Sequence, residues 1–248
     1  MSLKRSLKLA FLKVGALYHN SRDSRVLYYH DIHSAASFTD MSTSMELFEK
    51  HINSLRAKGY KVVDEIKSQK DEVELTFDDG FRGLYENFDF FIKNCIPVKL
   101  FLVTDFIGKE GYLSKNEIEE MLQTKLLKVE SHGTSHTNLD TLKKRELVFE
   151  LQGSKKRLED LFGVEIEEIC FPRGRFSEMV LTEARKAGYK KMYSSLPGPY
   201  HKRFRDGLIF RSLVQHADES EFNAILRGGD QIYFSRYLKM HYTEESPV

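Results

Sequence analysis

Short β-rich runs alternate with helical patterns along most of this chain, and this order constrains the fold more than any other feature. The runs lie at residues 26–30, 61–63, 73–77, 98–103, 126–131, 167–171, 190–194 and 208–214. A helix between two strands returns the chain so that the second strand runs parallel to the first, through a right-handed crossover. The sequence therefore predicts an α/β fold, a (β/α) barrel that is distorted or incomplete and seven-stranded, in a single domain. An open doubly wound sheet is the alternative.

Capping residues indicate where several helices begin and end. Thr43–Glu46 and the segment from Ser114 resemble capping boxes, and Asp218 resembles a further N-cap. Glycines stand where helix C-terminal caps are expected, at Gly59, Gly163 and Gly188.

Charge and cysteine content exclude some classes of protein. The chain has 248 residues with 38 Lys and Arg against 37 Asp and Glu, so its overall charge gives no sign of a nucleic acid partner. Cys95 and Cys170 lie in separate segments without a CxxC motif, which argues against a disulfide framework and a structural zinc site.

The two ends of the chain differ from its middle. We divide it into a basic amphipathic segment at 1–25, the barrel at 26–228, and a C-terminal tail at 229–248, which could cover the barrel or a partner. Lysines interrupt the apolar residues of 1–19, so we expect no secretory signal, no membrane span and a cytoplasmic location. The apolar residues of segment 1–19 lie on one side of the expected helix: Leu3, Leu7, Phe11 and Val14. That side could contact a membrane surface, and a packed or frayed terminal helix is the alternative.

Polar residues follow four of the predicted strands. Asp78 and Asp79 come directly after Phe77, and His132 follows the strand that ends at Ser131. His30 closes the first strand, and Pro172 and Arg173 follow another. Because the carboxyl ends of parallel strands carry the reacting groups in both candidate folds, we expect these side chains to meet at one rim.

A metal ion would explain the adjacent carboxylates. His132 and His136 are four residues apart, which puts both imidazoles on one side of a helical turn or tight loop. Together with one Asp they make three protein ligands, the composition of a catalytic zinc site with an open position. Nitrogen and oxygen ligands also suit Co, Mn or Ni. Either motif alone is more often a cap or a turn, but their joint occurrence favours a divalent metal ion.

Three of these motifs resemble those of a known family. "TFDDG", "SHGTSH" and "CFPRGRF" resemble the polysaccharide deacetylase family, the NodB-homology domain of carbohydrate esterase family four. "VLYYHDI" and "FEKHINSLRAKGYKVV" look like the subgroup of poly-N-acetylglucosamine deacetylases, and the resemblance covers residues 26–215. It implies that Asp78 is the catalytic base and that the metal ligands are Asp79, His132 and His136. The permuted motif order of this subgroup implies His30 as the catalytic acid, with His216 as the fallback.

The third motif departs from the family pattern. Cys170 stands where an arginine usually orients the base, so another group must hold Asp78. Arg173 replaces an aromatic residue, and the resemblance implies that a backbone N–H at this position stabilises the oxyanion. The Arg173 side chain either contacts an anionic substrate or lies in solvent.

The resemblance implies a metal-dependent hydrolase whose partner is an N-acetylated glycan or glycoconjugate and which removes its N-acetyl groups. Three alternatives stay open. The substrate could be a lipid-linked or nucleotide-linked sugar carrying a formyl or acetyl group. The chain could be an inactive carbohydrate-binding protein of the same fold, or a structural zinc protein that recruits His33.

Two further features have open functions. Aromatic residues near the rim could stack on sugars or belong to the core: Tyr28, Tyr29, Phe81, Tyr85 and Tyr112. The basic, Pro- and Gly-rich segment 194–207 is expected to overhang the same rim, either as a lid that contacts anionic groups or as a solvated loop.

Overall fold

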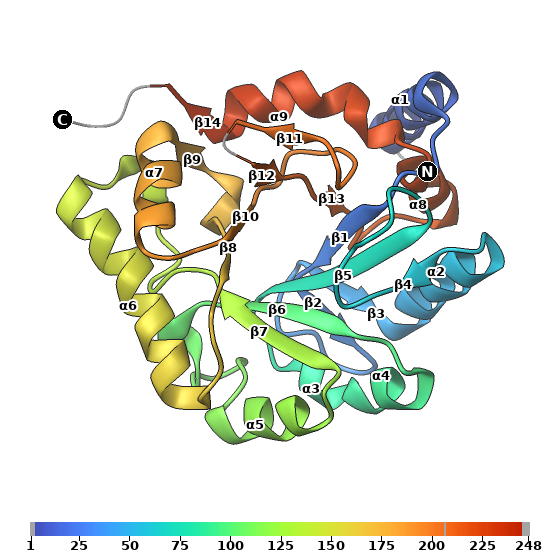
Figure 1. Cartoon of the computed structure of the whole chain (residues 1–248). Helices are drawn as coiled ribbons and strands as arrows, with labels where there is room; N and C mark the ends of the chain where they lie inside the picture. The colour runs from blue at the N-terminus through green and yellow to red at the C-terminus, as the bar shows by residue number, and fades with distance from the viewer. Residues whose placement is uncertain (1–2, 206, 245–248) are drawn as a thin grey trace.

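A computed structural model describes residues 3–205 and 207–244. Within them, ten strands form one strongly curled sheet, and each neighbouring pair is parallel except β11 with β12. Along the sheet the strands are β11 (Arg203–Phe204), β12 (Leu208–Ile209), β10 (Lys191–Tyr193), β8 (Glu168–Cys170), β7 (Leu127–Ser131), β6 (Val98–Leu102), β5 (Glu72–Asp79), β1 (Arg25–Tyr29) and β13 (Ser212–Leu213), with β4 (Lys61–Val62) paired to β5. The predicted distorted, incomplete (β/α) barrel is confirmed, but its sheet has ten strands rather than the seven expected, because short strands are added at its edges (Figure 1).

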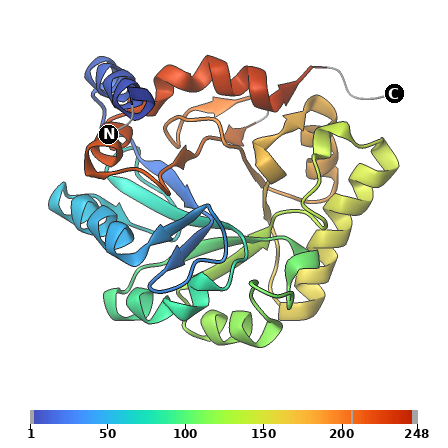
Figure 2. The ribbon, with the colours of Figure 1, turned by 180° about the vertical axis from the view of Figure 1, so that it is seen from behind.

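Helices surround the curled sheet on its outer side (Figure 1, Figure 2). In chain order they are α1 (Leu3–His19), α2 (Met45–Ala57), α3 (Gly83–Glu86), α4 (Phe88–Asn94), α5 (Lys115–Gln123), α6 (Lys144–Phe162), α7 (Glu178–Lys186), α8 (Glu219–Leu226) and α9 (Phe234–His241). Short 3-10 helices lie at η1 (Thr104–Phe106), η2 (Leu139–Thr141), η3 (Pro172–Gly174) and η4 (Gly229–Tyr233). Two small parallel pairs join β2 (Asp31–His33) to β3 (Ser42–Ser44) and β9 (Phe176–Ser177) to β14 (Tyr242–Thr243).

Side chains alternate between the two faces of the sheet, as the pleat requires. On β5, Leu75 and Phe77 belong to the core beneath the helices, whereas Glu74, Thr76 and Asp78 contact residues inside the barrel. A separate apolar cluster fills part of the interior: Val26, Ile66, Phe101, Cys170, Tyr193, Tyr200 and Ile209. This alternation brings Asp78 into the barrel at its carboxyl end.

The sheet is not closed into a full barrel, because its edge strands β11 and β13 are not paired with each other within the described residues. The strands β12 and β13 come from consecutive parts of one chain segment. The sequence predicted one strand at 208–214, but Phe210 and Arg211 interrupt it, and the described parts of β12 and β13 are not paired with each other. Phe234 of α9 packs its ring against Phe210 and Phe204, with centroids 5.5 and 6.4 Å apart. The C-terminal segment therefore covers the barrel here.

The N-terminal helix α1 packs on the barrel by one face. Leu12 and Ala16 are buried against η4 and α8. The backbones approach so closely that a Cβ on Gly15 would lie 2.4 Å from the carbonyl oxygen of Gly229, so this contact requires glycine. None of the described helices is long and apolar enough to cross a membrane. The division of the chain after residues 25 and 228 stays a prediction.

Two local predictions are wrong and others are confirmed. The N-cap of α2 is Ser44 rather than Thr43, because Thr43 lies in β3 and donates its hydroxyl to the carbonyl of Gln215. The capping box at Ser114 and the cap at Asp218 are confirmed. Asp78 and Asp79 do not follow the strand but are its last two residues.

The segment 194–207 does not overhang the rim along its whole length. Ser195 and Pro197 lie at the pocket, but Tyr200 donates its N–H to the carbonyl of Ser24, directly before β1, at the opposite end of the barrel. The reason is topological, since β12 runs parallel to β10 and the chain must return to the amino end of the sheet before β12 begins.

A buried ion network occupies the barrel interior near the amino ends of the strands. The Lys99 ammonium lies 2.7 Å from a Glu74 oxygen, 2.6 Å from a Glu168 oxygen and 2.9 Å from the Tyr193 hydroxyl. Burial alone would raise the pKa of Glu168, but Lys99 and Lys128 hold it at about 2, below the ordinary 4.5. Its ionised form therefore stabilises the folded state above about pH 4.5.

Lys99→Met should destabilise the fold, because it leaves two buried carboxylates without their shared cation. We expect a loss of about 3–5 kcal/mol in the free energy of unfolding at neutral pH, measured in urea. Without Lys99 the folded-state pKa of Glu168 rises, so the deficit should shrink as the pH falls toward 4.5. Lys156→Met is the matched control, because Lys156 is exposed and should change stability by at most about 0.5 kcal/mol. A deficit that is equal at all pH values would contradict the assigned ion network.

Candidate active site

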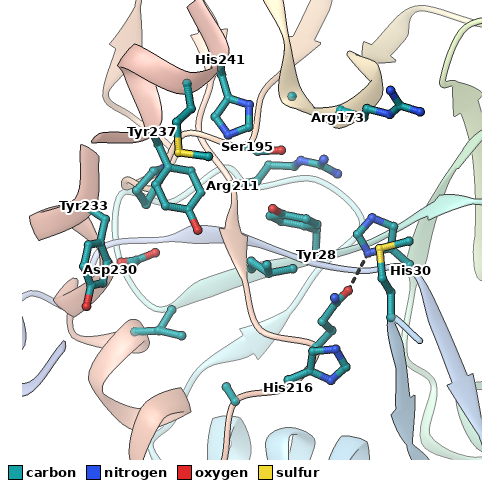
Figure 3. A pocket seen from close by; sticks show the side chains of 18 of the residues that line it. Tyr28, His30, Arg173, Ser195, Arg211, His216, Asp230, Tyr233, Tyr237 and His241 are labelled. Carbon is teal, nitrogen blue, oxygen red and sulfur yellow. Dashed lines mark hydrogen bonds between the residues drawn. The ribbon is translucent and has the colours of Figure 1, made fainter. Parts of the chain in front are cut away.

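A large pocket opens at the carboxyl end of the barrel, with a volume of about 960 Å³. Its floor contains the residues that the sequence predicted to meet: His30, Asp78, Asp79, His132 and His136. Its other wall comes from α1, η4 and α9, including Tyr233, Tyr237 and His241 (Figure 3). The strand-end rule thus places these polar groups together, while the two ends of the chain add a wall that it did not predict.

Three side chains converge on one point of this floor. The Nε2 atoms of His132 and His136 lie 3.5 and 3.2 Å from Asp79 Oδ1. His132 donates its Nδ1–H to the carbonyl of Cys170 at 2.7 Å, which leaves the lone pair of Nε2 directed at the carboxylate. Within the described residues, Asp79 Oδ1 is buried and accepts no hydrogen bond. Lone pairs that face each other in this way fit a cation between them.

The backbone at two of these residues is strained. Asp79 and His136 adopt positive φ angles of 72° and 62°, in the left-handed region that few non-glycine residues visit. Such a conformation costs on the order of 1–3 kcal/mol and persists only where the surrounding structure enforces it. The strained turns direct both side chains toward the same point. The predicted helical turn or tight loop of the histidine pair is a loop.

Burial adjusts the charge of each candidate ligand. Burial, and then the negative charge of Asp78, raises the pKa of Asp79 to about 7. Burial lowers the pKa of His132 to about 3 and that of His136 to about 4, so both imidazoles are neutral at pH 7. Neutral imidazole nitrogens and one carboxylate suit zinc and other borderline divalent ions, and the residues present fit such an ion.

Arg211 holds Asp78 in place, and sequence reasoning missed it. Its Nη1 and Nη2 each donate to one oxygen of Asp78 at 2.7 Å, Nη1 also reaches the Thr76 hydroxyl at 3.2 Å, and Nε donates to the carbonyl of Ser194. The guanidinium lies over the Tyr28 ring, 4.3 Å from its centroid. Burial would raise the pKa of Asp78, but Arg211 outweighs it and holds the pKa at about 2. Asp78 is therefore ionised and oriented.

Cys170 lies beside Asp78, where the family arginine was expected. Its thiol is 3.9 Å from Asp78 Oδ2. Burial raises the pKa of the Cys170 thiol far above its ordinary range, so it stays protonated and is a poor metal ligand. A second possible ligand group, Asp78 with His132 and Cys170, is therefore less suited to a metal than the group around Asp79.

His30 lies in the pocket and is fixed by a neighbour that sequence reasoning also missed. Its Nδ1 is 2.6 Å from the side-chain oxygen of Gln215, which assigns the proton to Nδ1 and leaves Nε2 free (Figure 3). Burial lowers the pKa of His30. His216 also lines the pocket, but its side chain is exposed. Of the two histidines, His30 is the one that the fold orients.

Arg173 lies on the pocket wall in η3 with a positive φ of 55°. Its side chain is exposed and donates to the Asn138 side chain at 3.3 Å. The aromatic residues divide between two places. Tyr28 lines the pocket, whereas Tyr29 is part of the core and Phe81 stacks on Tyr112 with centroids 4.7 Å apart.

The missed residues left weak signals in the sequence. Arg211 is the one charged residue in the apolar run 208–214, and a charge in such a run requires a buried partner. Gln215 directly follows that run, at a strand end. Neither signal identifies the partner, because Asp78 and Arg211 are 133 residues apart.

Comparisons with known proteins identify relatives of this chain. YxkH of Bacillus subtilis (strain 168), whose name describes it as a polysaccharide deacetylase, is 28% identical over 184 residues. These residues cover 70% of this chain and 64% of YxkH. The chain thus matches less than two thirds of that protein. The poly-beta-1,6-N-acetyl-D-glucosamine N-deacetylase of Staphylococcus aureus (strain MRSA252) is 27% identical over 215 residues, covering 75% and 74% of the two chains.

The fold and the sequence profile lead to one family. The crystal structure of a polysaccharide deacetylase from Bacillus cereus superposes with a TM-score of 0.70 at 25% identity, covering 83% of this chain and 69% of that one. The profile of the family described as Polysaccharide deacetylase matches residues 65–192, more than half of the chain. The resemblance seen in the motifs is confirmed, and the chain belongs to the polysaccharide deacetylase family.

Proposed function

We propose that this chain is a metal-dependent hydrolase that removes N-acetyl groups from an N-acetylated glycan. One observation carries the proposal: the ligand atoms of Asp79, His132 and His136 converge at a point of the pocket that Asp78 and His30 also line. Zinc is the ion we propose first, because three nitrogen and oxygen ligands with an open position are typical of catalytic zinc. The glycan is supported by the activity named for the S. aureus relative.

The chain's own residues supply the proton transfers. A divalent ion at this point would lower the pKa of a water molecule and polarise the acyl oxygen. Asp78, ionised and oriented by Arg211, would take the proton of the attacking water as general base. The backbone N–H of Arg173 is the proposed donor to the acyl oxygen as it gains negative charge.

His30 would protonate the departing nitrogen. It would act as the imidazolium: its Nδ1–H stays bonded to the side-chain oxygen of Gln215, so the proton that it gives up would be the second one, carried on Nε2. Asp78 and His30 would then serve opposite sides of one reaction, as base and acid. The adjacent carboxylates have separate roles, because Asp78 pairs with Arg211 while Asp79 faces the two imidazoles.

Metal binding and catalysis should separate in two variants. His132→Ala removes a ligand, so we expect loss of both bound zinc and acetate release. Asp78→Asn removes the base but no proposed metal ligand, so zinc should stay while acetate release from N-acetylglucosamine oligomers falls at least about 100-fold. The measurements are metal content by mass spectrometry and acetate release.

His33→Ala is the matched control for this experiment, because His33 bonds to Ser42 outside the proposed ligand set and should keep both metal and activity. Loss of zinc from His33→Ala would favour the structural zinc alternative. Full activity of Asp78→Asn would refute the assigned base.

Arg211 should act as a positioning residue. Arg211→Lys keeps a positive charge but cannot make two parallel bonds to Asp78 together with the bond to Ser194, so we expect kcat/KM to fall about 10- to 100-fold with zinc retained. Arg211→Met leaves Asp78 buried without a cation and should lower stability by about 3–5 kcal/mol. Arg211→Lys with unchanged kcat/KM would show that the bidentate geometry is unnecessary.

The acid can be identified by varying the leaving group. His30→Ala should reduce amide hydrolysis by at least about 100-fold, because an amine leaves poorly without a proton. Hydrolysis of an aryl acetate should fall much less, since a phenolate leaves without protonation. His216→Ala is the matched control and should preserve both activities. The reverse pattern, with His216→Ala selectively losing amide hydrolysis, would transfer the role of acid to His216.

A further inference from the structure

We propose that the outer face of α1 docks on the surface of an anionic phospholipid bilayer. The apolar residues Leu7, Phe11, Val14 and Tyr18 lie at helical spacing in one stripe along α1, and we call them the α1 stripe. Their exposed fractions are 57%, 46%, 57% and 85%, although the opposite face of the same helix is buried. The inference does not depend on the proposed catalytic function.

This exposure is unusual for the molecule as a whole. Five of the ten large hydrophobic side chains that are exposed in the described residues belong to α1, namely the α1 stripe and Leu17. Ile232 of η4, which packs against α1, and Met240 of α9, which packs against η4, are exposed as well (Figure 1, Figure 2). Single exposed apolar residues are normal, but a gathering on neighbouring elements indicates an interaction surface.

The charge beside the stripe selects the partner. Helix α1 contains Lys and Arg but no Asp or Glu, and α9 likewise carries Arg236 and Lys239 without an acidic residue. Two of the α1 cations are paired with α8, since Arg5 lies 3.2 Å from Asp218 and Lys8 lies 3.5 Å from Glu221.

Basic side chains flank the stripe and complete an interfacial pattern. By helical geometry Lys8, which also pairs with Glu221, and Lys13 project on opposite sides of the α1 stripe, and both are exposed. An apolar stripe bordered by cations is typical of a helix that lies in the headgroup layer, with its apolar side in the acyl boundary. Basic residues near a membrane favour anionic lipids.

The stripe is continuous with the pocket. Leu7, Phe11 and Met240 reach solvent and also line the pocket wall, together with Arg236. A bilayer on the α1 stripe would therefore lie at the pocket's edge, and its surface groups would come within reach of the pocket.

Binding to vesicles tests the docking directly. The full chain should bind vesicles of phosphatidylcholine with phosphatidylglycerol, measured by flotation, and bind pure phosphatidylcholine at least about tenfold more weakly. Added salt should weaken the binding to the anionic vesicles. The double variant Phe11→Ser with Val14→Ser should bind them at least about tenfold more weakly than wild type.

Matched controls separate the stripe from general surface effects. Phe149→Ser replaces an aromatic residue that is 69% exposed on α6, and it should leave vesicle binding unchanged. Lys13→Glu with Lys239→Glu should weaken anionic binding, whereas Lys93→Glu on α4 should not. Melting temperature and metal content of each variant show that the fold is kept.

Two outcomes would overturn the proposal. The first is that wild type fails to bind anionic vesicles, and the second is that Phe11→Ser with Val14→Ser binds them as well as wild type. If wild type fails to bind vesicles and instead forms a dimer in sedimentation equilibrium that these substitutions dissociate, the stripe joins two copies of the chain.

Discussion

The ion pair between Arg211 and Asp78 is the interaction on which the rest of the site depends. Asp78 and Asp79 are adjacent and almost fully buried, so their charges repel each other and lose hydration. Arg211 offsets this cost with two charge-assisted hydrogen bonds to Asp78 and uses its remaining donors on Thr76 and Ser194. Asp79 then remains available to bind a cation, so the two adjacent aspartates have different roles.

The same pair links the chemistry to the closure of the barrel. Arg211 lies between β12, which is paired to the edge strand β11, and β13, the other edge strand, and it reaches across the interior to the end of β5. The segment that joins the two sides of the opening therefore also orients Asp78. Gln215, four residues later, fixes His30 at the end of β1. One stretch of chain thus positions both groups proposed to transfer protons.

The parts of this structure that sequence predicted are those with local causes. Parallel strands follow from alternating patterns, and the convergence of Asp79, His132 and His136 follows from short motifs placed at strand ends. Arg211 and Gln215 could not be assigned in this way, because their partners are brought to them by the curl of the sheet. The Thr43 cap failed for a related reason, since its hydroxyl is bonded to Gln215 from a distant segment. The path of 194–207 was missed because a loop composition does not show which end of a barrel the chain must reach next.

The barrel interior contains two polar layers that differ in how their buried charges are paired. In the lower layer, near the amino ends of the strands, Lys99 meets the carboxylates of Glu74 and Glu168, and Lys128 adds a second cation beside Glu168, so charge is largely balanced inside the protein. In the upper layer, Asp79 Oδ1 faces two neutral imidazoles and accepts no hydrogen bond from the described residues. A buried oxygen without a partner does not by itself locate a site, since Glu74 Oε2 in the lower layer has none either. What distinguishes Asp79 is the coincidence of that oxygen with a positive φ, two converging imidazole Nε2 atoms and an open pocket, which the balanced layer lacks.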